Sequence, residues 1–278
     1  MKRADYSDIV TRALLEDLSD VGDVTSNSVI DPNNRSVAEF RPRAPGVIAG
    51  LDVAAFVFEK VDPTVDFRPL VRDGDQLSPN EPIAVVEGRS RSILTCERTV
   101  LNLLGRMSGV ATATKRLVDA VTDTGAQISD TRKTMPGLRV LDKYAVTVGG
   151  GINHRMGLYD AVMIKDNHIA AVGAIAEAVK SARGSVGPEV MVEVEVDNLD
   201  QLGVALTTDA DRVLLDNMDV GTLRKAVEMA GGTITTEASG GVTLDNVRTI
   251  AETGVDVISV GWITHSAPQL DIGLDFVS

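Results

Sequence analysis

The chain has 278 residues, of which 44% are hydrophobic and 24% are charged, a composition typical of globular proteins rather than of disordered, collagen-like or coiled-coil chains. Its formal net charge of −13 argues against a general nucleic-acid-binding protein, which needs a basic surface. The single cysteine, Cys96, excludes an intrachain disulfide and a zinc site built from several thiolates. No run of 18 apolar residues predicts a membrane span, and the first eight residues lack the apolar stretch of a secretory signal, so we expect a cytoplasmic protein.

The first part of the chain predicts a mixed α+β region. Apolar residues at helical spacing predict a helix over residues 6–17. Three apolar runs, separated by proline and glycine, predict strands at 37–40, 46–50 and 82–86. A longer pattern with a period of 3.6 residues predicts a helix from about residue 97 to 121, interrupted by Gly105 and Gly109. This helix is expected to connect two regions of the chain.

From residue 126 onward, short apolar runs alternate with amphipathic stretches of helical length. The runs that predict strands are 126–129, 161–164, 190–196, 213–215, 233–236 and 257–260. Stretches such as 170–183 and 220–230 predict helices between them. Strands that alternate with helices are typical of parallel βαβ units. Six such strands favour an α/β barrel, including an incomplete one, and a doubly wound open sheet is the alternative.

Polar and charged residues stand near the end of each predicted strand. In a barrel the carboxyl ends of the strands meet at one mouth, where substrates bind. Residues 130–168 contain six basic and four acidic side chains, a local excess of positive charge in an acidic protein, which predicts a small anionic ligand. Arginine suits carboxylates, because its two-pronged guanidinium matches their geometry, and lysine suits phosphate.

Two further features suggest a phosphorylated substrate with a magnesium ion. Ser239, Gly240 and Gly261 follow the last two predicted strands, where barrels often hold phosphate on backbone N–H groups. Glu195 and Asp216 offer hard oxygen ligands, which favour Mg²⁺ carried by a polyphosphate over zinc. A P-loop is excluded, because the sequence has no Gly-Lys pair.

Several ordered motifs then carry a resemblance to a known family. They are Glu97–Asn102 (ERTVLN), Asp130–Thr134 (DTRKT), Gly149–Arg155 (GGGINHR), Ile164–His168 (IKDNH), Glu193–Val196 (EVEV), Leu215–Asn217 (LDN) and Ser239–Gly241 (SGG). Together they resemble the quinolinate phosphoribosyltransferases (decarboxylating), also called nicotinate-nucleotide pyrophosphorylases. The resemblance extends over roughly residues 10 to 275.

The resemblance implies a type II phosphoribosyltransferase with an N-terminal α/β sandwich domain and an incomplete α/β barrel. We expect the sandwich at residues 1–108, with 271–278 packing on it, and the catalytic barrel at 109–270. It also implies a homodimer or higher homo-oligomer with shared active sites, in which Arg98 of one subunit reaches the barrel mouth of its neighbour. Binding of nucleic acid or of a membrane is not expected.

The resemblance further implies the reaction and the roles of individual residues. Phosphoribose would pass from phosphoribosyl pyrophosphate to quinolinate, giving nicotinate mononucleotide, pyrophosphate and CO₂ in de novo NAD biosynthesis, with Mg²⁺ as cofactor. The implied catalytic residues are Lys133, Glu195 and Asp216, and the last two would also serve the metal, through the substrate or water. The residues implied to hold the quinolinate carboxylates are Arg132, His154, Arg155 and Lys165. Those implied for the 5′-phosphate are Ser239, Gly240, Gly261 and His265, and Arg43 would contribute from the small domain.

One departure and three alternatives remain. Trp262 is bulkier than the small residue expected at its position in the phosphate loop. A relative encoded in molybdenum operons would share the scaffold but use another substrate. A class I aldolase would form a Schiff base on Lys133 or Lys165. A non-catalytic nucleotide-binding protein would bind the same ligands without releasing pyrophosphate.

Overall fold

In the computed structural model, which describes residues 1–277, the chain divides into two compact units. The first contains residues 1–115, 134–150 and 263–278. The second contains residues 116–133 and 151–262. Ser278, the last residue of the segment predicted to pack on the sandwich, lies outside the described residues.

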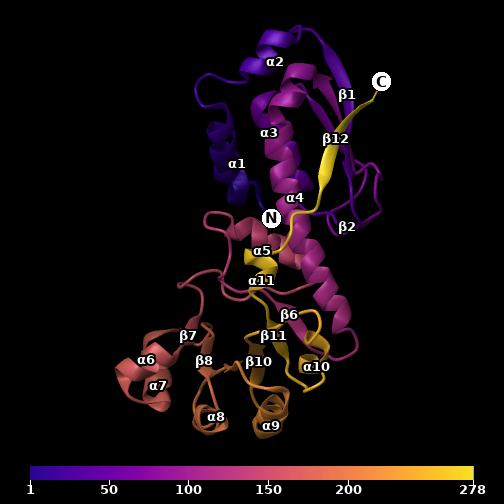
Figure 1. Cartoon of the computed structure of the whole chain (residues 1–278). Helices are drawn as coiled ribbons and strands as arrows, with labels where there is room; N and C mark the ends of the chain where they lie inside the picture. Colours follow the sequence, from indigo (N-terminus) through magenta and orange to yellow (C-terminus); the bar gives the residue numbers. More distant parts are fainter. Residues whose placement is uncertain (278) are drawn as a thin grey trace. The chain divides into compact units, whose positions relative to one another are not determined.

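The first unit is built on a four-stranded antiparallel sheet in the order β12-β1-β5-β3. Its strands are β1 (Arg35–Pro42), β3 (Asp66–Pro69), β5 (Ala84–Arg89) and β12 (Ile272–Val277). Side chains of β1 and β5 alternate between buried and more exposed positions, with Ala38 and Phe40 buried. The last strand of the chain thus pairs with the first, and Figure 1 shows β12 beside β1. A separate two-stranded sheet joins β2 (Gly46–Val47) and β4 (Gln76–Leu77).

The first unit also contains helices. They are α1 (Arg3–Leu18), α2 (Val24–Val29), α3 (Leu51–Val61), α4 (Ser90–Ala120), α5 (Arg139–Val148) and α11 (Trp262–His265). Two of these helices cross the boundary between the units: only residues 90–115 of α4 and 263–265 of α11 belong to the first unit. Helix α3 packs on the sheet, and α1 packs on α3 and α5. Phe58 of α3 lies against Phe40 and Phe67 of the sheet, with ring centroids 6.2 and 5.6 Å away. The prediction of a strand over 46–50 was mostly wrong. Only Gly46 and Val47 form a strand, and a helix begins at Leu51.

The second unit contains a six-stranded sheet in the order β6-β11-β10-β9-β8-β7, and every pair is parallel. The strands are β6 (Gln127–Ser129), β7 (Val162–Ile164), β8 (Val192–Val196), β9 (Arg212–Asp216), β10 (Thr235–Ser239) and β11 (Val257–Ser259). All six predicted strands are present, although β10 begins and ends later than predicted. This sheet confirms the prediction of an incomplete α/β barrel.

Helices of the second unit connect these strands and lie beside them in Figure 1. They are α6 (Asp166–Val172), α7 (Ile175–Ser185), α8 (Leu199–Ala205), α9 (Val220–Ala230) and α10 (Val247–Ala251). The single helix predicted over 170–183 is two helices, because Gly173 takes a left-handed conformation (φ 106°) that ends α6. In contrast, α9 has the predicted bounds, with Asp219 capping its first turn and Gly231 ending it.

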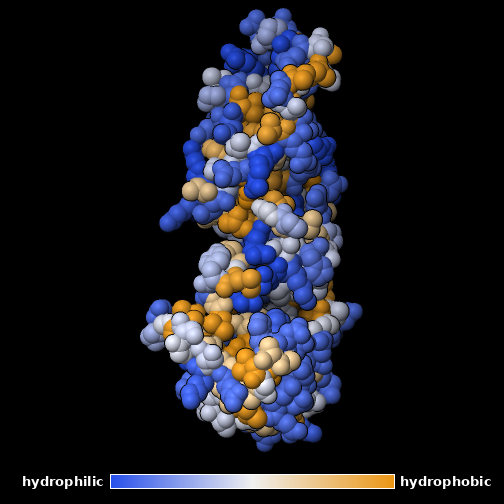
Figure 2. All heavy atoms as spheres, turned by 90° about the vertical axis from the view of Figure 1, so that its left-hand side faces the viewer, coloured by the Kyte–Doolittle hydropathy of each residue, from blue (hydrophilic) through white to orange (hydrophobic). Residues whose placement is uncertain are grey.

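The surface mixes hydrophilic and hydrophobic residues, as Figure 2 shows for one face. Within residues 1–277, no helix combines the length and the apolar character that a membrane crossing requires. Exposed large apolar side chains include Leu158 and Tyr159, which are 72% and 82% exposed. These two are neighbours on the segment that follows Arg155.

Candidate active site

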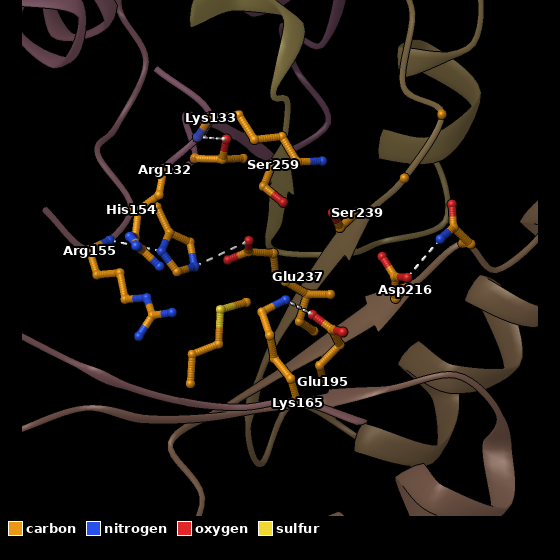
Figure 3. Close-up of a pocket in the computed structure, with 16 residues that line it drawn as sticks. Arg132, Lys133, His154, Arg155, Lys165, Glu195, Asp216, Glu237, Ser239 and Ser259 are labelled. Carbon is orange, nitrogen blue, oxygen red and sulfur yellow. Dashed lines mark hydrogen bonds and ion pairs between the residues drawn. The ribbon is translucent and has the colours of Figure 1, made fainter. Parts of the chain in front are cut away.

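A cavity of about 590 Å³ opens among the strand ends of the second unit. Nine of the residues singled out in the sequence line it: Arg132, Lys133, His154, Arg155, Lys165, Glu195, Asp216, Ser239 and Gly240. They come from segments far apart in the sequence and are brought together by the parallel sheet (Figure 3). The carboxyl edge of the sheet is therefore the candidate site, as the strand-end pattern predicted.

Strand register explains why these side chains meet. Ser239, the last residue of β10, pairs with Asp216 at the end of β9 and with Ser259 at the end of β11. Lys165 follows the last residue of β7, and Glu195 lies in β8. Since neighbouring parallel strands end at the same level, their terminal side chains form one rim.

Two arginines provide the positive side of the cavity. Figure 3 shows Arg132 and Arg155 on the same side of the pocket. Burial and the nearby charge of Arg132 lower the pKa of Arg155. The Arg155 guanidinium donates a hydrogen bond from Nη1 to the carbonyl of Ala161, 3.2 Å away. Crowded like charges in a partly desolvated position are typical of a site that receives an anion.

Lys165 and two carboxylates, Glu195 and Asp216, also line the cavity. Lys165 Nζ forms an ion pair with Glu195 Oε2. Asp216 accepts a hydrogen bond at Oδ2 from the amide of Asn217, over 2.6 Å. Carboxylate oxygens of Glu195 and Asp216 are the type of ligand that Mg²⁺ prefers, so the donor set fits a magnesium ion that arrives with a polyphosphate.

The turn after β10 contains two successive glycines, Gly240 and Gly241. Gly240 has φ 99°, and a Cβ built on it would lie 2.1 Å from Asn217 Oδ1. Only glycine fits there, because the Asn217 side chain packs directly against its backbone. Trp262 is compatible with this turn, because its indole Nε1 donates to the carbonyl of Val242 over 3.1 Å. The bulky residue anchors the segment that follows the glycines.

Four of the predicted site residues do not line this cavity. Gly261 follows β11 in the second unit, whereas Arg43, Arg98 and His265 belong to the first unit. Arg43 pairs with Asp275, with one guanidinium nitrogen 2.6 Å from a carboxylate oxygen. Arg98 lines a separate hollow of about 120 Å³ together with Glu16 and Asp17. His265 is exposed, and its Nδ1 lies 2.5 Å from the Ser266 hydroxyl.

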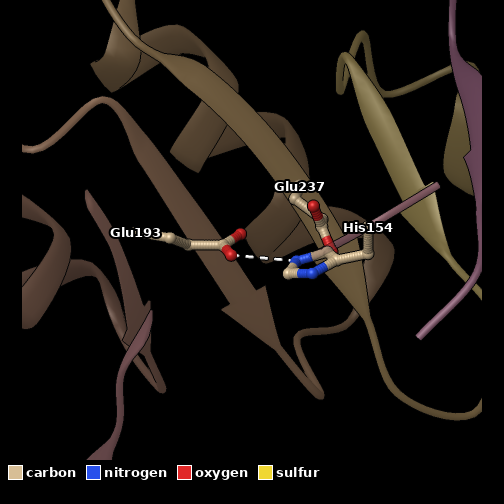
Figure 4. Close-up of side chains that lie close together, drawn as sticks. All are labelled: His154, Glu193 and Glu237. Carbon is tan, nitrogen blue, oxygen red and sulfur yellow. Dashed lines mark ion pairs between the residues drawn. The ribbon is translucent and has the colours of Figure 1, made fainter. Parts of the chain in front are cut away.

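A buried ionic cluster at the cavity joins His154, a predicted site residue that lines the cavity, to Glu193 and to Glu237, which also lines it and was not predicted as part of the site. His154 Nε2 lies 2.9 Å from Glu193 Oε2 and 3.5 Å from Glu237 Oε1 (Figure 4). Arg212 Nη1 lies 2.8 Å from Glu237 Oε2. Burial, and then the charge of Glu193, raise the pKa of Glu237, although His154, Ser259 and Arg212 act in the opposite direction. Glu193 belongs to the EVEV motif but was given no role, and Glu237 stood just beyond the predicted strand 233–236.

Comparisons with known proteins agree with this fold. The family models for quinolinate phosphoribosyl transferase match residues 23–108 (N-terminal domain) and 110–275 (C-terminal domain). The chain is 47% identical over 273 residues to a nicotinate-nucleotide pyrophosphorylase [carboxylating] of Mycobacterium leprae, covering 96% of each chain. It is 42% identical to a probable nicotinate-nucleotide pyrophosphorylase [carboxylating] of Bacillus subtilis, covering 99% of this chain and 94% of the relative.

Solved structures give the same result. A nicotinate-nucleotide pyrophosphorylase from Francisella tularensis superimposes with a TM-score of 0.95 at 39% identity, covering 100% of this chain and 98% of that chain. A second, from Ehrlichia chaffeensis, gives 0.94 at 40% identity, covering 98% of each chain.

An incomplete barrel with a cationic cavity at its strand ends, and relatives of this kind along its whole length, define the chain as a phosphoribosyltransferase. More particularly, it belongs to the quinolinate phosphoribosyltransferase family, as the motifs of the sequence predicted.

Proposed function

We propose that the chain transfers phosphoribose from phosphoribosyl pyrophosphate to quinolinate, with decarboxylation, and so forms nicotinate mononucleotide for NAD biosynthesis. The observation that carries the proposal is the joint presence of Arg132, Arg155 and Lys165 in one cavity with Glu195 and Asp216. A doubly negative ring acid needs cations, and an activated sugar needs carboxylates close to its reacting carbon.

The arginine side of the cavity suits the dicarboxylate. A guanidinium can hold a carboxylate with two parallel hydrogen bonds, and Arg132 and Arg155 provide two of them. Lys165 adds a third positive charge to the same cavity. Binding between these groups would orient the pyridine nitrogen toward the sugar.

The carboxylate and glycine side suits the phosphoribosyl group. Backbone N–H groups in the turn of Ser239 and Gly240, which line the cavity, can bind the 5′-phosphate. Glu195 and Asp216 can accept hydrogen bonds from ribose hydroxyls, and Lys133 can approach the pyrophosphate. Mg²⁺, held by the pyrophosphate and within reach of Glu195 and Asp216, would neutralise charge on the leaving group.

The reaction then follows from the charges. The ring nitrogen attacks C1 of the ribose while pyrophosphate leaves, and positive charge develops on the sugar. Carboxylates placed beforehand stabilise that charge, so catalysis depends on positioning and electrostatics. Once the nitrogen is quaternary, the C2 carboxylate leaves as CO₂, because the ring accepts the electron pair. A proton then takes the place of the lost carboxylate.

We further propose a homodimer or higher homo-oligomer in which each cavity is completed by Arg98 of a neighbouring subunit. Arg98 does not line the cavity of the second unit. Leu158 and Tyr159, exposed on the segment after Arg155, offer apolar surface near the cavity for such a neighbour. The assignment of Gly261 and His265 to the 5′-phosphate, the contribution of Arg43 to substrate binding from the small domain, and a cytoplasmic location stay predictions.

The direct test is incubation with quinolinate, phosphoribosyl pyrophosphate and Mg²⁺. We expect quinolinate to disappear while nicotinate mononucleotide and pyrophosphate form in equal amounts, and activity to fall when Mg²⁺ is removed by chelation. Turnover of another pyridine acid but not of quinolinate would favour the molybdenum-operon alternative. A borohydride-trapped adduct on Lys133 or Lys165 would favour the aldolase alternative, and binding without pyrophosphate release the non-catalytic one.

A further inference from the structure

Asn217 lines the cavity, but the proposed chemistry gives it no role. It directly follows Asp216 at the end of β9, and it lines the cavity together with Ser239 and Gly240. Its backbone is left-handed, with φ 52°, a conformation that glycine and asparagine adopt more readily than most residues. Glycine would meet this backbone requirement equally well. The asparagine side chain therefore calls for a separate explanation.

The side-chain amide of Asn217 reaches the carboxylate of the residue before it. Nδ2 donates a hydrogen bond to Asp216 Oδ2 over 2.6 Å. A carboxylate that accepts a bond from a fixed donor keeps a defined orientation and presents its remaining lone pairs in a defined direction. Asn217 therefore orients the carboxylate that the proposed function assigns to the ribose hydroxyls and to Mg²⁺.

The same residue also holds the turn that follows β10. A Cβ on Gly240 would lie 2.1 Å from Asn217 Oδ1 and 2.6 Å from its Cγ, so the amide occupies the space beside the glycine backbone. The backbone N–H of Asn217 donates to the carbonyl of Ser239 over 2.9 Å. Asn217 thus contacts, with both backbone and side chain, the turn to which the proposed function assigns the 5′-phosphate.

The two subsites that Asn217 contacts would receive two ends of one sugar phosphate. The covalent frame of the sugar limits the distance between its 5′-phosphate and its ring hydroxyls, so a site that binds both groups at once needs a matching spacing. Strand register makes Asp216 and Ser239 Cα partners, but it does not set the direction of the Asp216 carboxylate or the path of the turn beyond Ser239. The contacts of Asn217 set both.

We propose that Asn217 is a positioning residue: it fixes the Asp216 carboxylate and the turn Ser239–Gly241 relative to each other, so that the ribose hydroxyls and the 5′-phosphate of one sugar phosphate bind together. This inference rests on the proposed function for the identity of that ligand. Aspartate at this position would keep the size of the side chain, but it would replace the donor to Asp216 with a second negative charge.

Two ligands of different length separate positioning from direct binding. Ribose 5-phosphate spans both subsites, whereas inorganic phosphate occupies the turn alone. We expect Asn217→Gly to weaken binding of ribose 5-phosphate on the order of tenfold and to leave binding of inorganic phosphate within about twofold of wild type. Calorimetry measures both constants without turnover. An equal loss for both ligands would mean that Asn217 binds phosphate directly. That result would overturn the proposal, and so would unchanged affinity for ribose 5-phosphate.

A charged variant tests the donor. Asn217→Asp should weaken binding of ribose 5-phosphate at least as much as Asn217→Gly, because the Asp216 carboxylate loses its hydrogen bond and meets a like charge. The melting temperatures of both variants should stay near that of wild type, because Asn217 is exposed. Wild-type affinity of Asn217→Asp would show that the donor is dispensable and would overturn the proposal.

Asn80→Gly is the matched control for the backbone. Asn80 is also left-handed, with φ 65°, and also exposed, but it does not line the cavity. This variant should bind ribose 5-phosphate and inorganic phosphate as the wild type does. A loss in Asn80→Gly as large as that in Asn217→Gly would mean that glycine at any left-handed position has this effect, and it would overturn the proposal.

A double-mutant cycle tests the contact between Asn217 and the turn. Gly240→Ala should weaken binding of ribose 5-phosphate, because the added methyl group would push the Asn217 amide away from Asp216. In the Asn217→Gly background the same substitution should cost less, because the two atoms nearest to the methyl group are gone. Equal costs in the two backgrounds would overturn the proposal.

Steady-state kinetics connect the inference with turnover. Asn217→Gly should raise the KM for phosphoribosyl pyrophosphate and lower kcat, because the sugar is held less well in the reacting geometry, while quinolinate affinity stays within about twofold of wild type. Equal losses for both substrates would overturn the proposal.

The two proposals can fail separately. If the wild type binds ribose 5-phosphate and Asn217→Gly weakens this binding, but the wild type does not consume quinolinate, the proposed function fails while the role of Asn217 stands. If the wild type consumes quinolinate and Asn217→Gly keeps its affinities and KM values, the proposed function stands while the role of Asn217 fails. A wild type that does not bind ribose 5-phosphate would also overturn the role of Asn217.

Discussion

Single residues in the cavity divide by charge into two groups with separable roles. Arg132 belongs to the cationic group and lines the cavity near Arg155. We expect Arg132→Ala to lower kcat/KM for quinolinate on the order of a hundredfold or more, because a charge-assisted bond to a carboxylate is lost and Arg155 cannot replace it. The melting temperature should stay near that of wild type.

The control for Arg132 is Arg224→Ala, which removes an exposed arginine from α9 in the same unit. It should keep full activity. Turnover at the wild-type rate by Arg132→Ala, measured with saturating phosphoribosyl pyrophosphate, would remove Arg132 from the site.

The buried carboxyl of Glu237 gives a pH dependence with a definite sign. Its pKa is raised above the ordinary 4.5, first by burial and then by the charge of Glu193. A raised carboxyl pKa contributes stability that is present below the unfolded-state pKa and is lost as the pH rises through the folded-state value. The free energy of unfolding should therefore fall as the pH rises above about 4.5.

Glu237→Gln cannot ionise, so its stability should change less steeply over the same pH interval, although it should be less stable overall because Arg212 loses its partner. Denaturant unfolding at a series of pH values measures both slopes. Parallel curves for wild type and Glu237→Gln would show that Glu237 does not carry this dependence.

How far the sequence predicts the site can be judged from the same residues. Arg132, Lys165 and Asp216 were found because each lies at or just beyond the end of an apolar run, where a parallel sheet must place it at the mouth. Glu237 was missed because β10 begins at Thr235 rather than at 233, so a residue expected beyond the strand lies within it and points inward. Strand ends depend on pairing with neighbours, which a local apolar pattern does not contain.

Whole elements were missed where burial contradicts the usual pattern. The residues of α3 are mostly apolar, with Val53, Phe56 and Val57 all buried, and they follow directly on the short apolar run 46–50 that predicted a strand. In α5 the charged side chains of Asp142 and Lys143 are fully buried, although charged residues usually mark the exposed face of a helix. Asp142 is compensated by Arg106, whose Nε lies 2.9 Å from its carboxylate. Only the folded unit supplies that partner.

Gly109 in the long helix α4 marks a place where another segment of the chain packs against the helix backbone. Gly109 does not end the helix, contrary to the expected interruption, and a Cβ there would lie 2.1 Å from the carbonyl oxygen of Pro268. The segment before β12 therefore lies directly on the helix backbone. We expect Gly109→Ala to destabilise the protein by about 1–3 kcal/mol, since backbone atoms would have to move.

Gly203→Ala in α8 is the matched control, because the nearest atom to its added methyl group is 4.0 Å away. That substitution should stabilise the protein by about 0.5–1 kcal/mol through the better helix propensity of alanine. Denaturant unfolding of both variants gives the two signs. A stabilising effect at Gly109 would contradict the close approach of residues 268–269.

At the scale of the whole molecule, the chain forms two compact units, and the boundary predicted near residue 108 stays a prediction because α4 continues from Ser90 to Ala120. The cavity is lined by the second unit, whereas Arg98 stands in the first. If Arg98 completes a neighbouring subunit's site, each active site needs residues from two chains. Defects in Arg98 and in Arg132 should then complement each other in mixed dimers.

We expect Arg98→Ala and Arg132→Ala to be inactive separately and to recover about a quarter of wild-type activity when they are co-expressed in equal amounts, because half of the dimers are mixed and one of their two sites is intact. Arg132→Ala mixed with Asp216→Ala is the control, since both changes fall in the cavity of one unit and every mixed site would keep a defect. Differently tagged chains allow the mixed dimer to be isolated and assayed. Recovery in neither mixture would contradict a shared site, and equal recovery in both would mean that dimer formation alone restores activity.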